Sequence, residues 1–280
     1  MPATERPSTI AAYLSAFSLR FRLLLQYRAA AWAGFGTQTF FGLIRVMVFA
    51  AFFASSTQPQ PMSYDQVMSY IWLGQVLFAL LPFREDPDIA ALIRNGNIAY
   101  EFVRPVQLFW FWLARQIANQ SAPVLLRALP MLVVSAVVFP LIGLNTWALH
   151  PPESVAGLLC FAILLLLAIL LSGMIKLLAT VSLFWTINGE GLSLLLPALV
   201  WPLCGIILPL SFYPDWSQPI IRALPFRGLM DVPFQFYIGS LPPSALFREM
   251  TRQCAWIAAL GLVSYRWFRA GTRRVVVQGG

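Results

Sequence analysis

Charged side chains are concentrated in one stretch of this chain, which runs from Phe83 to Val106 and reads FREDPDIAALIRNGNIAYEFVRPV. Its charged members are Arg84, Glu85, Asp86, Asp88, Arg94, Glu101 and Arg104. Such side chains form ion pairs and charge-assisted hydrogen bonds, and long apolar blocks flank them. A charged insert of this length cannot lie in lipid, because the bilayer core offers its polar groups no partner. We therefore predict that this stretch projects into water and contacts a soluble partner.

No other residues are spaced as a known catalytic or cofactor site. The chain has no GxxxxGK[ST] loop, no HExxH, no CxxC and no GxSxG sequence. Its three cysteines, Cys160, Cys204 and Cys254, lie inside apolar runs without metal-ligand spacing. Its single histidine, His150, stands alone in a short loop. We therefore expect no catalytic residue, no metal site and no cofactor.

Acidic residues inside the apolar runs are nearly missing. Only Glu190 comes close, and it lies at the end of a run. Secondary transporters use buried carboxylates as proton or sodium relays, so a proton-coupled carrier is disfavoured. An intramembrane enzyme is disfavoured too, because no acid, base and nucleophile share one depth.

The composition is that of a membrane protein. The 280 residues are 59% hydrophobic with a mean hydropathy of +0.72, and 11% are charged, against about 25% in soluble domains. The unbroken apolar runs favour an all-α polytopic protein over a β-barrel, whose strands would alternate. The net charge of +8 fits arginines at membrane edges better than nucleic-acid binding.

The apolar runs predict six transmembrane helices in one domain that spans residues 1–280. We place them at residues 29–54, 66–82, 124–144, 154–176, 189–210 and 245–267. Residues 10–28 mix leucine and aromatic residues with arginines and predict an amphipathic helix on the membrane surface; the alternative is that they extend the first span. Residues 211–244 are rich in aromatic residues and proline, and predict short helices that enter the outer leaflet without crossing.

Several residues within the spans call for a protein environment. Arg45 lies deep in the first span, where it either lines a translocation path or pairs with a carboxylate or carbonyl of another span.

Pro197 and Pro202 should kink or break the fifth span and favour an interior position for it. Lys176 falls near the opposite face of the membrane. We interpret it first as a residue that sets the topology and only second as a transport residue. The aromatic cluster at 109–112 suits the headgroup level, with Arg115 reaching back to water.

The arginines fix the predicted orientation. One side collects Arg6, Arg20, Arg22, Arg28, Arg84, Arg94, Arg104, Arg266, Arg269, Arg273 and Arg274. The other side has Arg222 and Arg227, or four arginines if Arg248 and Arg252 are included. By the positive-inside rule, both termini and residues 83–106 are cytosolic.

The chain resembles the membrane subunit of bacterial type-2 ABC exporters, in particular the daunorubicin-exporter-like permeases. The resemblance rests on IRNGNIAYEFVRPV (93–106), FWTINGEGL (184–192), LPLSFYPDW with the following LPF and VPFQFYIG (208–239), and RRVVVQGG (273–280). Each motif alone is loose, but their order and spacing cover essentially the whole chain.

The resemblance implies an N-terminal interfacial helix, a cytosolic coupling helix between the second and third spans, and an extracellular re-entrant hairpin between the fifth and sixth. Residues 84–94 would supply the coupling helix, and its carboxylates Glu85, Asp86 and Asp88 would face an ATPase subunit. Arg94, Asn95 and Gly96, with Arg104 and Pro105, would form the turn back to the membrane. The implied partners are two copies of a cytosolic ABC ATPase and a second permease chain, the same or related, in the bacterial cytoplasmic membrane.

These expectations predict a non-enzymatic permease subunit of an ATP-driven exporter. Its apolar path favours a hydrophobic or amphipathic substrate, and the path candidates are Arg45, Pro197 and Pro202. The alternatives are a membrane anchor for a cytosolic complex, and a secondary carrier. A pure anchor gives no reason for an intramembrane arginine.

Overall fold

A computed structural model describes residues 9–186 and 190–273, and this part of the chain is helical with no strand. Its α-helices are α1 (Thr9–Leu25), α2 (Arg28–Ser55), α3 (Tyr64–Val76), α4 (Pro87–Arg94), α5 (Ile98–Phe102), α6 (Leu108–Val133), α7 (Phe139–Leu141), α8 (Val155–Ser182), α9 (Glu190–Leu203), α10 (Gln218–Ala223), α11 (Asp231–Tyr237) and α12 (Leu246–Thr272). A π-helical stretch at Val134–Val138 joins α6 to α7. Both chain ends, with the RRVVVQGG motif beyond Arg273, and residues 187–189 of FWTINGEGL lie outside the described residues.

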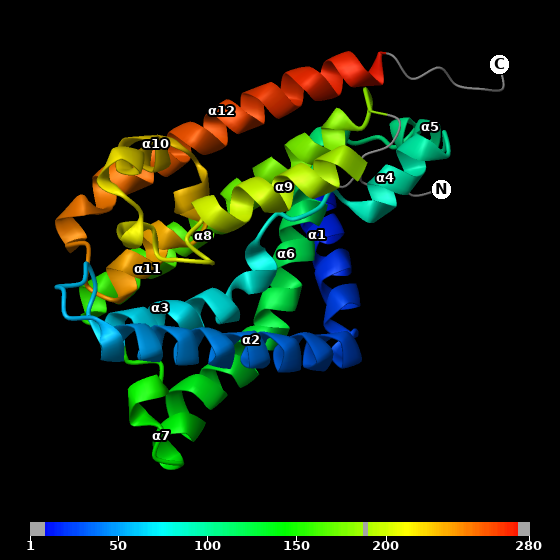
Figure 1. Ribbon diagram of the computed structural model, residues 1–280. Helices are drawn as coiled ribbons and strands as arrows, with labels where there is room; N and C mark the ends of the chain where they lie inside the picture. The colour runs from blue at the N-terminus through cyan, green and yellow to red at the C-terminus, as the bar shows by residue number, and fades with distance from the viewer. Residues whose placement is uncertain (1–8, 187–189, 274–280) are drawn as a thin grey trace.

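Helices α9 and α12 run lengthwise between two ends of the molecule, whereas α1 and α6 run across them (Figure 1). One end carries α4 and α5, and the opposite end carries α10 and α11. The first helix, α1, ends before Gln26 and runs across the bundle in a direction different from that of α2. It is therefore a separate helix that packs on α6, and the alternative that it extends the first span is wrong.

The core is built around α3. Ser63 begins this helix with a capping box: its side chain accepts from the Gln66 backbone, and the Gln66 side chain accepts from the Ser63 backbone. Every residue from Val67 to Val76 is buried. The Trp72 indole lies over Gly42 of α2, where an added Cβ would come within 2.7 Å of the ring. Glycine at position 42 therefore lets α2 and α3 approach closely.

Three helical stretches among the described residues are long and apolar enough to cross a membrane: Arg28–Ser55, Leu108–Leu141 and Val155–Ser182. The helices at the second, fifth and sixth predicted spans are shorter or more charged than these three. Helix α3 has 13 residues and α9 has 14, or about 20 Å each. Helix α12 has 27 residues but carries more charge. The structure is thus an all-helical membrane protein whose number of crossings stays a prediction.

The second and third predicted spans have different bounds as helices. The α-helix of the second ends at Val76, and a 3-10 turn at Phe78–Leu80 follows. The third helix starts at Leu108 rather than at 124, and continues through Pro123 and Pro130. Phe109 and Trp112 are buried against Phe268 of α12. These two side chains thus pack within the protein, and the headgroup level of the cluster stays a prediction.

The fifth predicted span ends at Leu203 rather than at 210. Gly205 follows with a φ of +89°, and an added Cβ there would come within 2.1 Å of the Tyr70 hydroxyl. The chain can make this turn only at a residue without a side chain. Helix α9 lies at the surface of the single chain, since Leu194 and Leu195 are largely exposed. The expected interior position is therefore not found within one chain.

The fourth and sixth helices run past their predicted ends, to Ser182 and Thr272. Between α9 and α12, the predicted short helices are present as α10, α11 and several 3-10 turns. How deep they lie in a membrane stays a prediction.

Candidate functional site

Asp86 begins helix α4. It is the N-cap, and its Oδ1 accepts hydrogen bonds from the backbone N–H groups of Asp88 (3.0 Å) and Ile89 (3.3 Å). Pro87 follows at the first helical position, where its missing N–H costs nothing. The Oδ1 atom of Asp86 therefore caps the first turn of α4.

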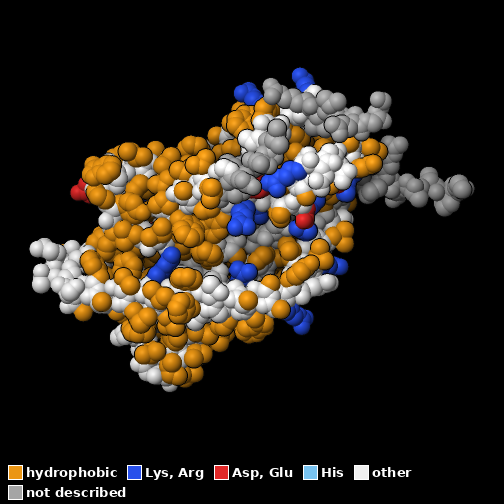
Figure 2. Space-filling model, turned by 45° about the vertical axis from the view of Figure 1, so that its right-hand side comes forward, with side chains coloured by type: hydrophobic (Ala, Val, Ile, Leu, Met, Phe, Trp, Pro, Cys, Tyr) orange, Lys and Arg blue, Asp and Glu red, His pale blue; other side chains and the backbone are white. Residues whose placement is uncertain are grey.

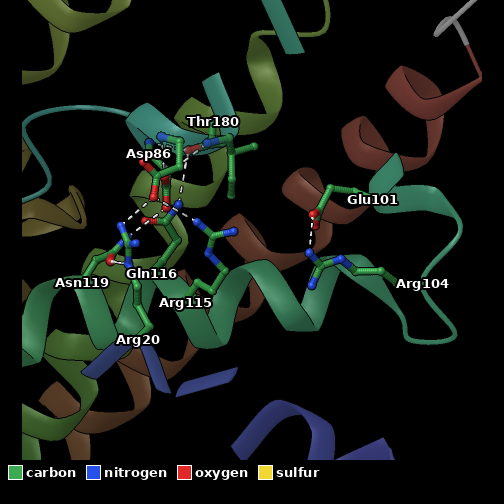
Figure 3. Close-up of polar contacts among 10 residues, drawn as sticks. Arg20, Asp86, Glu101, Arg104, Arg115, Gln116, Asn119 and Thr180 are labelled. Atoms are coloured by element: carbon green, nitrogen blue, oxygen red, sulfur yellow. Dashed lines mark hydrogen bonds and ion pairs between the residues drawn. The ribbon is translucent and has the colours of Figure 1, made fainter. Parts of the chain in front are cut away.

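The second Asp86 oxygen ties α4 to the long helices. Oδ2 accepts from Asn119 Nδ2 of α6 at 2.8 Å, and the Asp86 backbone N–H donates to Thr180 Oγ1 of α8 at 3.1 Å (Figure 3). Asp86 is 0% exposed. An ionised carboxylate at this depth needs these donors to offset its lost hydration.

Asp88 adds charge to the same junction. Its Oδ2 lies 2.7 Å from Arg20 Nη2 of α1 and 3.2 Å from Arg115 Nη2 of α6. Arg20 Nε also donates to Asn119 Oδ1 at 2.6 Å. These contacts hold α4 against α1, α6 and α8. We call this set the α4 anchor, and its members are Arg20, Asp86, Asp88, Arg115, Asn119 and Thr180.

Of the three carboxylates expected to face the ATPase, Glu85 and Asp86 turn inward in this chain, whereas the side chain of Asp88 is 49% exposed. Glu85 is 8% exposed and pairs with Arg94 across 3.5 Å, while Asp86 is fully buried. Lys176 of α8 lies within electrostatic range of both carboxylates. It is half-buried beside them, so it belongs to this junction in addition to any role in topology. The carboxylates turn inward because α4 needs a cap and the nearby cations need counter-charges.

The chain turns after Arg94, but this turn leads into α5, and the return toward the long helix α6 follows only after α5. Asn95 ends α4, and Gly96 has a φ of +71° with open space around its Cα. Beyond α5, Arg104 pairs with the buried Glu101 at 2.8 Å and stacks over the Phe111 ring at 5.3 Å. The chain from Arg104 and Pro105 then enters α6 at Leu108. Arg84 lies exposed before α4.

Two apolar side chains at the outside of this segment were not singled out from the sequence. Tyr100 is 76% exposed and Val103 is 81% exposed, whereas Ile98 on the inner side is 1% exposed. We call Tyr100 and Val103 the α5 surface. Apolar residues inside a stretch predicted to lie in water are a signal that could have found them, because water alone does not favour their exposure.

Figure 2 shows a face that is largely hydrophobic, with Lys and Arg atoms scattered over its upper, central and right-hand parts.

Arg45 and the fifth span meet in the structure. Arg45 Nη1 donates to the carbonyl oxygen of Ile206, just after α9. The partner of Arg45 is thus a backbone carbonyl, which agrees with the alternative that Arg45 pairs with a carboxylate or carbonyl of another span. Pro197 and Pro202 both lie inside α9 and do not end it.

Buried carboxylates are more numerous than the sequence suggested. Asp231 of α11 and Glu249 of α12 are 1% and 3% exposed, so the expectation that such groups are nearly missing is wrong. Arg227 lies 3.7 Å from both. Burial raises the pKa of the Asp231 carboxyl, and Arg227 opposes this rise. The Glu190 side chain lies outside the described residues.

Together, these features define a helical membrane protein with a polar segment clamped to one end of its bundle. Comparison with protein families matches residues 41–279 to the ABC-2 family transporter protein. The chain therefore belongs to this family and is a membrane permease subunit of an ABC transporter. A comparison with curated proteins gave no match.

Proposed function

We propose that the chain is the permease of an ATP-driven exporter and that α4 and α5 receive the ATPase. In this proposal six helices cross the bacterial cytoplasmic membrane, and both termini and residues 83–106 are cytosolic. Two ATPase copies bind beneath two permease chains, the second being the same or related. The substrate is hydrophobic or amphipathic, and Arg45, Pro197 and Pro202 border its path.

The observation that carries this proposal is the division of the α4–α5 segment into an inner and an outer side. The inner side is fastened to three long helices by the α4 anchor. The outer side exposes Tyr100 and Val103 beside the half-exposed side chains of Arg94 and Arg104. Tyrosine and arginine side chains are enriched among the residues that dominate protein–protein binding energy.

This arrangement gives a physical route for coupling. A partner that displaces the α5 surface also displaces α4, because the two helices are joined by a short turn. Ion pairs and hydrogen bonds of the α4 anchor then carry the displacement to α1, α6 and α8. The carboxylates of the α4 anchor, Asp86 and Asp88, hold α4 in place within the permease. The α5 surface makes the contact with the ATPase.

Truncating the α5 surface tests this proposal. The double substitution Tyr100→Ala and Val103→Ala should lower the amount of ATPase subunit that co-purifies with the tagged permease by about thirtyfold, since loss of one binding hot spot costs about 2 kcal/mol. Transport-linked ATP hydrolysis should fall with it. The unfolding midpoint of the permease alone should stay unchanged, because both side chains are exposed.

The matched control is the double substitution Trp216→Ala and Phe247→Ala. These side chains are 76% and 73% exposed, but they belong to the end with α10 and α11. The control should retain the ATPase. Full ATPase retention by the Tyr100→Ala and Val103→Ala variant would contradict the assignment of the α5 surface.

An apolar cleft supports the proposed substrate class. It has a volume of about 550 Å³ and lies between α1, α3, α6 and α8. Its walls include Phe21, Leu73, Leu125, Ala128 and Leu165. Predominantly apolar walls of this kind favour a hydrophobic group over an ion.

Filling the cleft should impair transport. Ala128→Trp places an indole into it and should reduce transport of a hydrophobic substrate by about tenfold or more, while the ATPase still co-purifies. Leu129→Trp is the matched control, because Leu129 is 69% exposed on the same helix and does not line the cleft. Equal transport by the two variants would remove the cleft from the path.

A further inference from the structure

A polar cavity of about 470 Å³ lies at the end opposite to the α4 anchor. It is enclosed by the loop before α3, the turns around α10, helix α11 and the first turns of α12. Four arginines and three carboxylates line it: Arg222, Arg227, Arg248, Arg252, Asp215, Asp231 and Glu249. Neither the α5 surface nor the apolar cleft includes any of these residues, so the proposed function leaves them unexplained.

The Asp231 carboxylate has a hydrogen-bond donor within the chain on each of its two oxygens. It accepts hydrogen bonds from the Tyr70 hydroxyl at 3.0 Å and from Gln235 Nε2 at 2.8 Å. Arg227 Nη2 lies 3.7 Å away. A buried carboxylate with these donors has little capacity left to attract a cation from the cavity.

Glu249 is satisfied in the same way. Its Oε1 lies 3.1 Å from Arg248 Nε, and its Oε2 lies 3.0 Å from Arg252 Nη1 and 3.7 Å from Arg227 Nη1. Three guanidinium groups thus share one carboxylate. Each guanidinium has five N–H donors, so the arginines keep free donors at the cavity wall.

Arg222 adds a positive charge that the cavity does not balance. It is exposed at the end of α10, and no carboxylate of the described residues lies within ion-pair distance of it. Asp215, the third acid of the cavity, is exposed to solvent. The side chains of Arg248 and Arg252 are 64% and 38% exposed, so they remain accessible.

We propose that this cavity binds a phosphate-class oxyanion through Arg222, Arg248 and Arg252. The planar guanidinium fork matches phosphate oxygens in two-point hydrogen bonds. The paired carboxylates hold the arginines in place without cancelling all of their charge. Two sources supply the same chemistry: the headgroup of an anionic lipid, and a free phosphate group. The inference does not depend on the ATPase.

The test uses the purified full chain in a neutral detergent. Its unfolding midpoint is followed while inorganic phosphate, phosphatidylglycerol or the zwitterionic phosphatidylcholine is titrated. We expect phosphatidylglycerol to raise the midpoint more than phosphatidylcholine. Arg222→Gln should raise the half-saturating concentration about tenfold, as loss of one charge-assisted contact implies.

The control is Arg266→Gln, which removes the same charge from an exposed position of α12 far along the helix. It should leave the half-saturating concentration unchanged. Stabilisation by phosphatidylglycerol alone assigns the anion to a lipid headgroup, and stabilisation by both compounds assigns it to the phosphate group itself. An unchanged response in Arg222→Gln, or no stabilisation by either compound, would overturn the proposal.

Discussion

Replacing Asp86 with lysine should lower the free energy of unfolding of the permease by about 3–5 kcal/mol, the usual cost of breaking a buried charged contact. The substitution removes the N-cap of α4 and the acceptor for Asn119. It also places a second cation close to Lys176, for which Asp86 is a neighbouring counter-charge. Thermal unfolding of the purified permease, without its ATPase, measures the loss.

Asp65→Lys is the matched control for this prediction. The Asp65 side chain is 66% exposed and lies 3.8 Å from His150, so its reversal should change the stability by less than about 1 kcal/mol. The sequence alone predicted that Asp86 contacts the ATPase. If Asp86→Lys leaves the permease as stable as the native chain and abolishes ATPase binding, that first interpretation is correct and the anchoring role is wrong.

Removing the Arg227 guanidinium, at the end of the molecule that carries α10 and α11, should lower the free energy of unfolding by a similar amount. Arg227→Gln leaves Asp231 and Glu249 buried without their shared cation. The expected loss is about 3–5 kcal/mol at neutral pH. Arg248→Gln is the control: its side chain is 64% exposed and its partner Glu249 keeps Arg252, so we expect a loss below about 1 kcal/mol.

The Arg227→Gln defect should depend on pH in a defined direction. Burial already raises the pKa of Asp231 in the folded chain, and without Arg227 this pKa rises further. A folded-state pKa above the unfolded value of 3.8 means that stability is lost as pH rises through the folded-state pKa. The variant should therefore be closest to the native chain near pH 4 and furthest from it near pH 7. A defect that is equal at both values would exclude the Asp231 carboxyl as its cause.

Apolar runs predicted much of this fold because they determine where helices can lie. The sequence identified the helices around Arg28–Ser55 and Val155–Ser182, and the separate N-terminal helix. The sequence-based prediction failed for helix bounds that depend on packing against other helices. Helix α3 is buried and gives way to a 3-10 turn after Val76, and the first turns of α6 carry Phe109 and Trp112, which pack against Phe268.

The polar segment at 83–106 was found from composition, but its orientation was not. Charge alone does not say whether a carboxylate points to water or to a helix. Asp86 is directed inward by the cap of α4 and by Asn119 and Thr180, which lie far away in the sequence. The same limitation hid Glu249, which meets Arg227 of the turn before α11 only once α12 is folded back against that turn.

Unequal helix lengths make the permease sensitive to the thickness of its bilayer. The continuous stretch Leu108–Leu141 has 34 residues, or about 51 Å, against a hydrocarbon core of about 30 Å. Helix α8 has 28 residues. Figure 1 shows α6 crossing α2 at a steep angle, and a helix with such excess length can fit a bilayer by tilting. A thinner bilayer demands more tilt from α6 than from α8, and so changes the angle between two walls of the apolar cleft. Hydrophobic mismatch thereby becomes a physical variable that sets the width of the cleft.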